Sequence, residues 1–153
     1  MSFTTALPSE RVRFPLRPRL RARTAVTAAR LLTRLAPHRL ERALTRIARG
    51  AVPATEAQAT NARELVLSTS LMMNGHRSCL PRSVAIALTC RIRGTWPTWC
   101  VGTLMSPPFS PHAWVEAEDR LIGEKGDHAS WARLITVAAP EPLTGSRAAS
   151  STQ

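Results

Sequence analysis

Apolar side chains recur at helical spacing through the first half of the chain. Leucine, valine and isoleucine return every three or four residues, with arginines between them, which is typical of amphipathic helices. Glycine or proline follows each such stretch and predicts its end. Residues 1–19, which contain three prolines, are interpreted as a loosely ordered lead-in or an early helix. The three predicted helices cover residues 20–35, 38–49 and 55–72.

The pattern changes at Ser78, where a largely apolar helix is expected to begin. Ser78 is a favourable N-cap residue, and Pro81 falls in the first turn, where a missing N–H has little cost. The residues that follow, up to Gly94, are apolar around much of the helix. Helices of this kind are buried, so we expect this one at the centre of the fold.

Strands are predicted after this helix. Residues 97–105 and 112–117 have the pattern of two strands joined by a proline-rich loop, and 120–124 form a short partner strand. Residues 131–138 are expected to supply one more helix-to-strand element. Helices followed by antiparallel strands predict an α+β fold.

The length fits one domain with an appended segment. A chain of 153 residues with 44% hydrophobic residues can bury a substantial core, so wholesale disorder is excluded. We divide the chain into an arginine-rich helical segment at 1–74, a core at 75–140, and a small, polar tail at 141–153 that is expected to be flexible.

Positive charge is concentrated in the first third of the chain. The formal net charge is +11, and residues 1–50 contain twelve arginines against two glutamates. This asymmetry is typical of nucleic-acid-binding arms. However, Phe3 and Phe14 are the only aromatic residues there, and the arginines fall on the polar faces of the predicted helices. A face that docks a protein or peptide partner is therefore favoured over nucleic-acid binding.

The sequence also limits where the protein can reside. It has no run of about eighteen apolar residues that could span a membrane, and charges interrupt the N-terminus before a secretory signal could form. Its cysteines are odd in number, which does not fit a disulfide framework. These features predict a protein of the reducing cytoplasm.

Cys79 is the candidate nucleophile because it directly follows the predicted N-cap. The unpaired N–H groups and the dipole at a helix start stabilise a thiolate. Cys90 lies about 16 Å farther along the same helix, too far for a disulfide with Cys79. Cys90 and Cys100 are expected to be core residues.

A cysteine nucleophile needs an imidazole close to it in space. His112 is the favoured partner because it opens a strand whose apolar neighbours would hold it rigidly. The alternatives, His38, His76 and His128, do not lie on such a strand.

Hairpin geometry favours Glu124 as the carboxylate that orients His112. A three-residue turn at 117–119 would place the two residues opposite each other. The same register creates two favourable cross-strand pairs, one aromatic–aliphatic and one of opposite charge. These pairs are Trp114 with Ile122 and Glu116 with Arg120.

Other arrangements are less favourable. A two-residue turn at Glu118-Asp119 would put Glu124 on the face away from His112, and this dipeptide is a poor primed-turn sequence. Glu116 lies about 13 Å along the strand from His112, too far to orient it. Asp127 is the remaining alternative to Glu124.

Zinc binding is an alternative use of the same residue types. The candidate ligands show neither a Cys-x-x-Cys nor a His-Glu-x-x-His motif, so their spacing does not fit the common zinc sites. We therefore expect no metal and no cofactor. The ligand types in question are His76, Cys79, Cys90, Cys100, His112 and His128.

Several motifs stand at characteristic spacing, namely Cys79-Leu80-Pro81-Arg82-Ser83, Arg91-Ile92-Arg93-Gly94, Val101-Gly102, Pro108-Phe109, His112-Ala113-Trp114-Val115-Glu116 and Gly123-Glu124. Together they resemble the lasso peptide leader peptidases, which are small transglutaminase-like (papain-like) cysteine proteases. The resemblance covers about half of the chain, residues 75–140. The third triad position is often Asp in that family and is Glu124 here.

The resemblance implies an enzyme that cuts the leader from a ribosomally made precursor peptide. An ATP-dependent cyclase then joins the freed amine to an acidic side chain. Some members carry a leader-recognition domain with a three-stranded sheet at the N-terminus. Residues 1–74 show no three-strand pattern, so we expect a peptidase that acts with a separate leader-binding protein.

The expected triad is Cys79 as nucleophile, His112 as base and acid, and Glu124 as orienting group. Backbone N–H groups at the helix start would bind the oxyanion, with Asn74 or His76 as a side-chain donor. The same triad also fits a transglutaminase-type acyltransferase, because an acyl-enzyme can react with water or with an amine. A non-catalytic interaction protein is disfavoured because the Cys79, His112 and Glu124 residues of the expected triad are all present.

Overall fold

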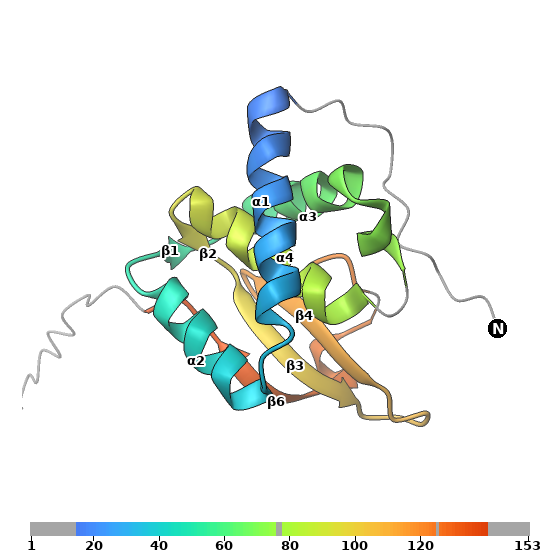
Figure 1. Cartoon of the computed structure of the whole chain (residues 1–153). Coiled ribbons are helices and arrows are strands. Elements are labelled where there is room, and N and C mark those ends of the chain that lie inside the picture. Colours follow the sequence, from blue (N-terminus) through green and yellow to red (C-terminus); the bar gives the residue numbers. More distant parts are fainter. Residues whose placement is uncertain (1–14, 76–77, 125, 141–153) are drawn as a thin grey trace, which may run out of the picture.

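The fold is α+β, as the sequence predicts. The computed structural model describes residues 15–75, 78–124 and 126–140. Helices dominate the first part of this region and strands the second (Figure 1). The helices are α1 (Leu16–Leu32), α2 (Pro37–Ala48), α3 (Glu56–Thr69) and α4 (Cys79–Ile92), with the 3₁₀ turn η1 (Leu71–Asn74) before α4.

The main sheet is antiparallel, with strand order β5-β4-β3-β6. Its strands are β3 (Thr98–Leu104), β4 (Pro111–Ala117), β5 (Arg120–Leu121) and β6 (Trp131–Val137), and the short 3₁₀ turn η3 (His128–Ser130) leads into β6. A second, parallel pair joins β1 (Val52–Pro53) to β2 (Thr95–Trp96). The sequence pattern does not predict this two-residue pairing.

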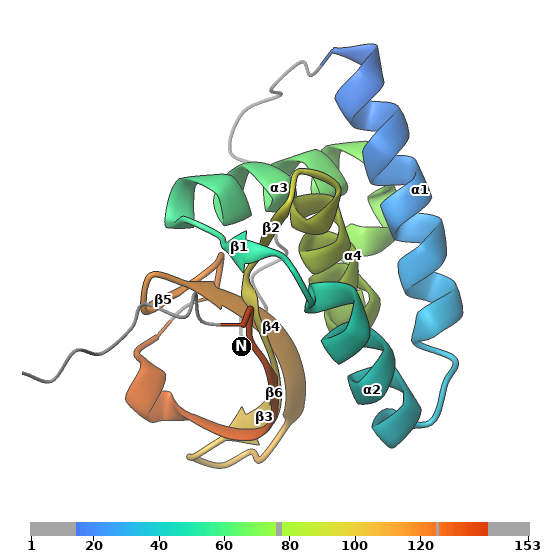
Figure 2. The ribbon, with the colours of Figure 1, turned by 90° about the vertical axis from the view of Figure 1, so that its left-hand side faces the viewer.

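The helix α4 lies at the centre of the fold, as expected. Residues 83–90 are buried without interruption, and α1 and α3 pack against α4. The helices lie together on one side of the main sheet (Figure 2). One hydrophobic core joins all four helices to the sheet, so it extends across the boundary predicted at residue 74. Its members include Ala25, Leu44, Val66, Ile86 and Val115.

The register predicted for the β4–β5 hairpin is wrong. Ala117 pairs with Arg120 and Glu116 with Leu121, so the turn has two residues, Glu118 and Asp119, instead of three. The predicted pairs of Glu116 with Arg120, Trp114 with Ile122 and His112 with Glu124 therefore do not form in the ladder.

A contact from another element explains why Glu118-Asp119 forms this turn. Both residues have positive φ, 50° and 57°, as the primed hairpin turn requires. The Glu118 carboxylate accepts a hydrogen bond of 2.9 Å from the backbone N–H of Glu56, in the first turn of α3. A carboxylate at a helix N-terminus is favourable and offsets the strain of the turn.

Several element boundaries also differ from the expectations. The helix α1 begins at Leu16 rather than residue 20, α3 ends at Thr69 rather than residue 72, and β5 stops at Leu121 rather than residue 124. The element expected at 131–138 is a strand preceded by a 3₁₀ turn. The predicted tail at 141–153 and most of the lead-in at 1–19 lie outside the described residues. No helix among the described residues combines the length and hydropathy needed to cross a bilayer.

Candidate active site

Cys79 is the first residue of α4 and is partly exposed. Ser78 stands at the N-cap position as predicted, but its side chain does not cap the helix. The hydroxyl instead donates a 2.6 Å hydrogen bond to the carbonyl of Met72. The N–H groups at the start of α4 are therefore not used by the N-cap side chain, and the backbone N–H of Leu80 lowers the pKa of the Cys79 thiol.

His112 lies near the start of β4, where that strand has an open edge. One edge of β4 pairs with β3, with Gly102 as the partner of His112. On the other edge, β5 pairs with Glu116 and Ala117, and one further bond from Ile122 reaches Val115, three residues from His112. The His112 ring packs against Trp131 of β6 at a centroid distance of 5.0 Å. Strand and aromatic contact together hold the imidazole at the edge that α4 approaches.

The Cys79 thiol and the His112 imidazole interact, and each shifts the pKa of the other. The His112 bond lowers the Cys79 pKa, burial opposes this, and backbone N–H groups of Ala113 and Leu80 lower it further. Burial alone would lower the His112 pKa, but Cys79 and Glu124 raise it to about 9. These opposite shifts favour transfer of the proton from the thiol to the imidazole.

Glu124 is the carboxylate that contacts the imidazole. Its Oε2 is 3.1 Å from His112 Nε2. The Nε2 atom is buried, and its N–H does not point along the line of a hydrogen bond, so the contact is a close ion pair. Such contacts commonly tighten only when substrate binds.

Glu124 reaches His112 after the hairpin ladder has ended. The last ladder bond runs from the N–H of Ile122 to the carbonyl of Val115, at 3.0 Å. Gly123 then turns the chain with a φ of 72°. The sequence argument thus names a residue that does contact His112, but the geometry behind that argument is wrong.

The other candidates from the sequence lie elsewhere or outside the described residues. Asp127 is exposed and makes no ion pair with His112, and His38 is exposed on α2. Asn74, a possible oxyanion donor, has a buried Oδ1 atom without a hydrogen-bond partner in the described part of the chain. The other oxyanion candidate, His76, is outside the described residues.

Glu116 anchors a polar network on the His112 face of the sheet. Its carboxylate accepts hydrogen bonds from Trp114 Nε1 at 2.7 Å and from two guanidinium nitrogens of Arg133, at 3.1 and 2.7 Å. His128 also joins this network, 3.5 Å from Glu116 and 2.9 Å from Arg133. His128 is therefore engaged in holding the sheet, not in activating the thiol.

Cys90 and Cys100 are buried, as expected for core residues. Burial raises the pKa of Cys90 to about 11 and that of Cys100 to about 12. Neither thiol is a nucleophile near neutral pH. Within residues 15–75, 78–124 and 126–140, no three His, Cys, Asp or Glu side chains gather as metal ligands would.

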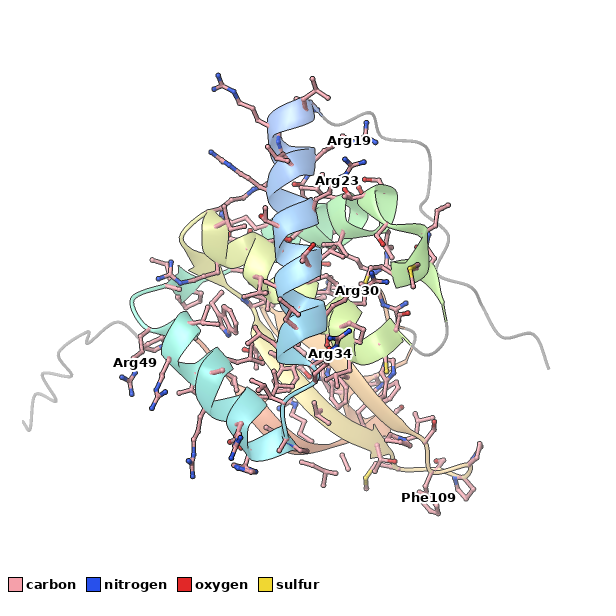
Figure 3. All side chains as sticks on the ribbon, viewed as in Figure 1. Arg19, Arg23, Arg30, Arg34, Arg49 and Phe109 are labelled. Atoms are coloured by element: carbon pink, nitrogen blue, oxygen red, sulfur yellow. The ribbon has the colours of Figure 1, made fainter. Side chains whose placement is uncertain are left out.

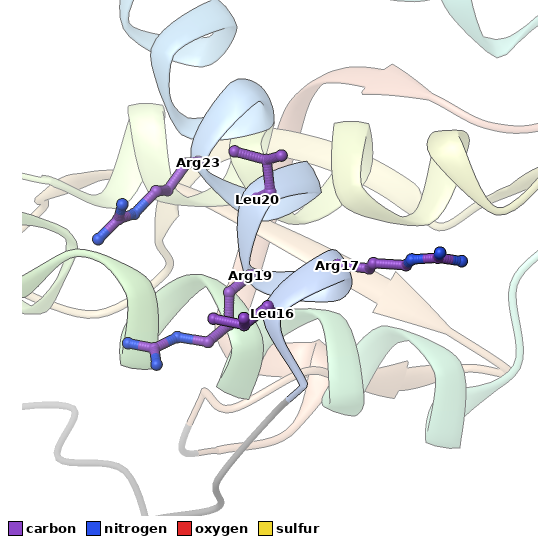
Figure 4. Close-up of a pocket in the computed structure, with 5 residues that line it drawn as sticks. All are labelled: Leu16, Arg17, Arg19, Leu20 and Arg23. Atoms are coloured by element: carbon purple, nitrogen blue, oxygen red, sulfur yellow. The ribbon is translucent and has the colours of Figure 1, made fainter.

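The surface hollow at the start of α1 contains none of these site residues. It is lined by Leu16, Arg17, Arg19, Leu20 and Arg23 (Figure 4). The candidate active site is instead a row of side chains at the junction of α4, the open edge of β4 and the segment after β5.

Comparison with known families matches most of the chain. A family model described as the transglutaminase-like superfamily matches residues 22–136, from α1 to β6. This chain belongs to the transglutaminase-like superfamily. No curated protein and no solved structure gave a match.

The transglutaminase-like region includes Cys79, His112 and Glu124 together with the arginine-rich helices that precede them. The match confirms the sequence resemblance at the level of the superfamily. Transglutaminase-like proteins are typically cysteine proteases or acyltransferases, and the match supports an enzyme of this kind.

Proposed function

We propose that this transglutaminase-like protein is a leader peptidase that cleaves the leader from a ribosomally synthesised lasso precursor peptide. The observation that carries the proposal is the row formed by Cys79, His112 and Glu124, in which the pKa of the thiol is lowered and that of the imidazole is raised to about 9. A thiolate beside an imidazolium is the resting state from which a cysteine protease attacks.

The row supports a two-step hydrolysis. Cys79 Sγ attacks the scissile carbonyl carbon, and His112 gives its proton to the leaving amine, so that the peptide bond breaks and a thioester remains. Water then attacks the thioester while His112 takes up its proton. The leader leaves with a new carboxylate, and the thiolate is restored. Glu124 holds the imidazole and favours its charged form.

The start of α4 is suited to stabilise the oxyanion of both steps. Because the Ser78 hydroxyl is bonded to Met72, its side chain does not occupy the first N–H groups of the helix. Backbone N–H groups at a helix N-terminus stabilise developing negative charge. Asn74, in the turn just before α4, is a candidate side-chain donor.

The lasso-specific role is supported by the sequence motifs around the triad, whose residues also hold the site together. Arg82, three residues after the nucleophile, donates a 3.1 Å hydrogen bond to the carbonyl of Met73. Ser83 accepts a 3.0 Å bond from Trp99 of β3, which ties α4 to the sheet. Trp114 and Glu116 of the histidine motif bond each other.

The partners in this proposal are the precursor peptide, a separate leader-binding protein and the lasso cyclase. The exposed arginines offer a surface for docking them. Arg19, Arg23 and Arg30 are exposed on α1, and Arg34 and Arg49 are exposed in the turns after α1 and α2 (Figure 3). Arg42 and Arg46 are exposed on α2. Such a surface fits an acidic patch on one of these partners or on the leader.

Cleavage of the cognate precursor tests the proposed activity. The purified chain is incubated with a lasso precursor peptide and a leader-binding protein, which the proposal expects to be encoded in neighbouring genes. Mass spectrometry should show a leader and a core fragment whose masses together exceed that of the precursor by one water. The Cys79→Ala variant should produce no fragments while its circular dichroism spectrum stays native. A fragment carrying an amine instead would show an acyltransferase. Full cleavage by the Cys79→Ala variant would overturn the proposal.

Charge reversal tests the docking surface separately. Arg30, Arg34, Arg42 and Arg46 are replaced together by Glu, and binding to the leader-binding protein and the cyclase is measured by pull-down. We expect weaker binding and slower cleavage. Unchanged binding and cleavage would remove the docking role and leave the active site untouched.

A further inference from the structure

Arg63, on α3, packs against the backbone of Gly123. A Cβ atom added to Gly123 would overlap Arg63 Nε, Cζ and Cδ, so the guanidinium lies directly on this glycine. Gly123 also has a φ of 72°, which residues with side chains adopt rarely. The glycine therefore permits both the turn before Glu124 and the close approach of Arg63.

Arg63 is partly buried among charged neighbours. Burial and the charge of Arg82 lower its pKa, whereas the charges of Glu124 and Glu64 raise it. Among the described residues no carboxylate makes a direct ion pair with Arg63. Arg63 thus acts on Glu124 as a nearby charge and on Gly123 as a packing surface.

The segment that carries Glu124 has little support from the sheet. β5 ends at Leu121, and the last ladder bond is made by Ile122, two residues before Glu124. The contact between Glu124 and His112 lacks the alignment of a hydrogen bond. Apart from its contact with His112, the segment is therefore free to be positioned by a group outside the hairpin.

We propose that Arg63 is a positioning residue that holds the Gly123–Glu124 segment against His112. Packing on Gly123 fixes the path of the backbone, and the guanidinium charge draws the Glu124 carboxylate toward the site. The inference builds on the proposed function, since it assumes that the thiolate–imidazolium pair is the working state of the site. Arg63 itself does not touch the reacting atoms.

Loss of Arg63 should narrow the pH range of the thiolate–imidazolium pair. Glu124 raises the pKa of His112, and protonated His112 in turn lowers the pKa of Cys79. When Glu124 is no longer held, His112 loses part of its charge near neutral pH. The pKa of Cys79 then rises toward that of an ordinary thiol.

Alkylation by iodoacetamide reports this directly and needs no peptide substrate. The rate follows the fraction of thiolate. Cys90 and Cys100 are buried with raised pKa values, so Cys79 is the thiol that reacts below about pH 8. Peptide mapping by mass spectrometry assigns the modified residue.

We compare the full chain with Arg63→Gln, Arg63→Lys and Arg93→Gln. Arg93, at the end of α4, is the control, because it donates a 2.8 Å bond to Asn61 of α3 and forms no ion pair with Glu124 in the described part of the chain. Arg63→Gln should shift the rise of the Cys79 alkylation rate to higher pH, by about half a pH unit to one pH unit. Arg63→Lys, which keeps the charge, should restore part of the shift, and Arg93→Gln should match the wild type.

A second pair of variants moves Arg63 without removing it. Gly123→Ala pushes the guanidinium off the glycine and also strains the backbone. Gly50→Ala is its control, because Gly50 has nearly the same φ, 73°, with no atom near the added Cβ. Both should lose stability, but only Gly123→Ala should shift the alkylation curve.

The possible failures are distinguishable. Natively folded Arg63→Gln with the wild-type curve, or a Gly123→Ala curve identical to that of Gly50→Ala, would overturn the positioning role. A wild-type curve with the pKa of an ordinary thiol would instead overturn the ion pair on which the proposed function depends.

Discussion

Glu124 Oε2 lies 3.1 Å from His112 Nε2, although the hairpin that carries Glu124 does not pair these two residues. Continued from the pair of Ala117 and Arg120, the ladder would bring Glu124 opposite Ala113. It ends instead at Ile122, and Gly123 turns the chain so that the Glu124 carboxylate contacts the His112 imidazole. The contact depends on this turn, not on the register.

Replacement of His112 should slow cleavage more than replacement of Glu124. His112 transfers the proton in both steps of the proposed reaction, whereas Glu124 only holds its charged form. We expect His112→Ala to lower kcat/KM by about a thousandfold and Glu124→Ala by about ten- to a hundredfold. Timed sampling of the precursor digest by mass spectrometry gives both rates.

Asp127→Ala is the control for Glu124→Ala. Asp127 is exposed, and its backbone carbonyl accepts a hydrogen bond from Ser130 that the substitution preserves. We expect a kcat/KM within about twofold of the wild type, as for a surface substitution away from the site. If Asp127→Ala were the more damaging of the two, Asp127 would be the orienting group.

The pH dependence of cleavage should show the raised pKa of His112. His112 must be protonated to release the leaving amine, and its pKa is raised to about 9 by Cys79 and Glu124 against the effect of burial. Activity should therefore persist to about pH 9 and fall above it. In Glu124→Gln the pKa of His112 drops, so the basic limb of kcat/KM against pH should move to lower pH. A basic limb unchanged by this substitution would show that Glu124 does not act on the imidazole.

The sequence predicts the helices and the position of the nucleophile because these depend on local signals. Pro81 and the apolar run after it mark the start of α4 locally, and Ser78 takes the N-cap position although its side chain bonds Met72 instead of the helix. The pairing of β1 with β2 is different, since it joins Val52 to Thr95 across more than forty positions through only two residues each. No local sequence pattern predicts a pairing of two such short, distant segments.

Long-range contacts also explain what the sequence misses at the site. The hairpin turn is set by the bond between Glu118 and the N–H of Glu56, which lies on α3. Arg63 is one of twenty arginines, and only the fold brings it to Gly123. In the sequence, only Gly123 beside Glu124 indicates that another group packs closely against this segment, and it does not indicate which residue that is.

Loss of the Glu116 charge should destabilise the protein without altering the thiol. Glu116 is buried and bonds both Trp114 and Arg133, but it is not in contact with Cys79 or His112. Glu116→Gln removes the charge that pairs with Arg133, so we expect it to lower the free energy of unfolding by about 2 kcal/mol. The loss is not larger because the Arg133 guanidinium is partly exposed and can be solvated by water. Urea denaturation measures the loss, and the pH curve of Cys79 alkylation should stay in place.

Arg120→Gln serves as the comparison for Glu116→Gln. Arg120 lies 3.7 Å from Glu56 in an ion pair that is exposed on both sides. Pairs of this kind contribute little, so the change should stay within about 0.5 kcal/mol. Equal losses in the two variants would mean that the Glu116 network does not hold the sheet.

Gly102→Ala should disturb both the sheet and the site, because β6 passes over Gly102 without room for a side chain. A Cβ there would overlap the carbonyl oxygen of Ala132 and approach Trp114, and the register of β3 with β6 shifts at this point. Backbone cannot move aside as a flexible side chain can, so we expect a loss of about 3 kcal/mol. In a chain of this size, this lowers the melting temperature by about 10 °C.

The effect of Gly102→Ala should extend to the thiol, since β6 carries Trp131, against which the His112 ring packs at 5.0 Å. Displacement of β6 loosens that contact, and the alkylation rate of Cys79 near neutral pH should fall. Gly75→Ala is the control, because Gly75 has an ordinary φ of −72° and a Cβ there would be no closer than 3.5 Å to any atom. A Gly102→Ala variant as stable as Gly75→Ala would show that β6 can shift freely. The aromatic packing would then not be what fixes His112.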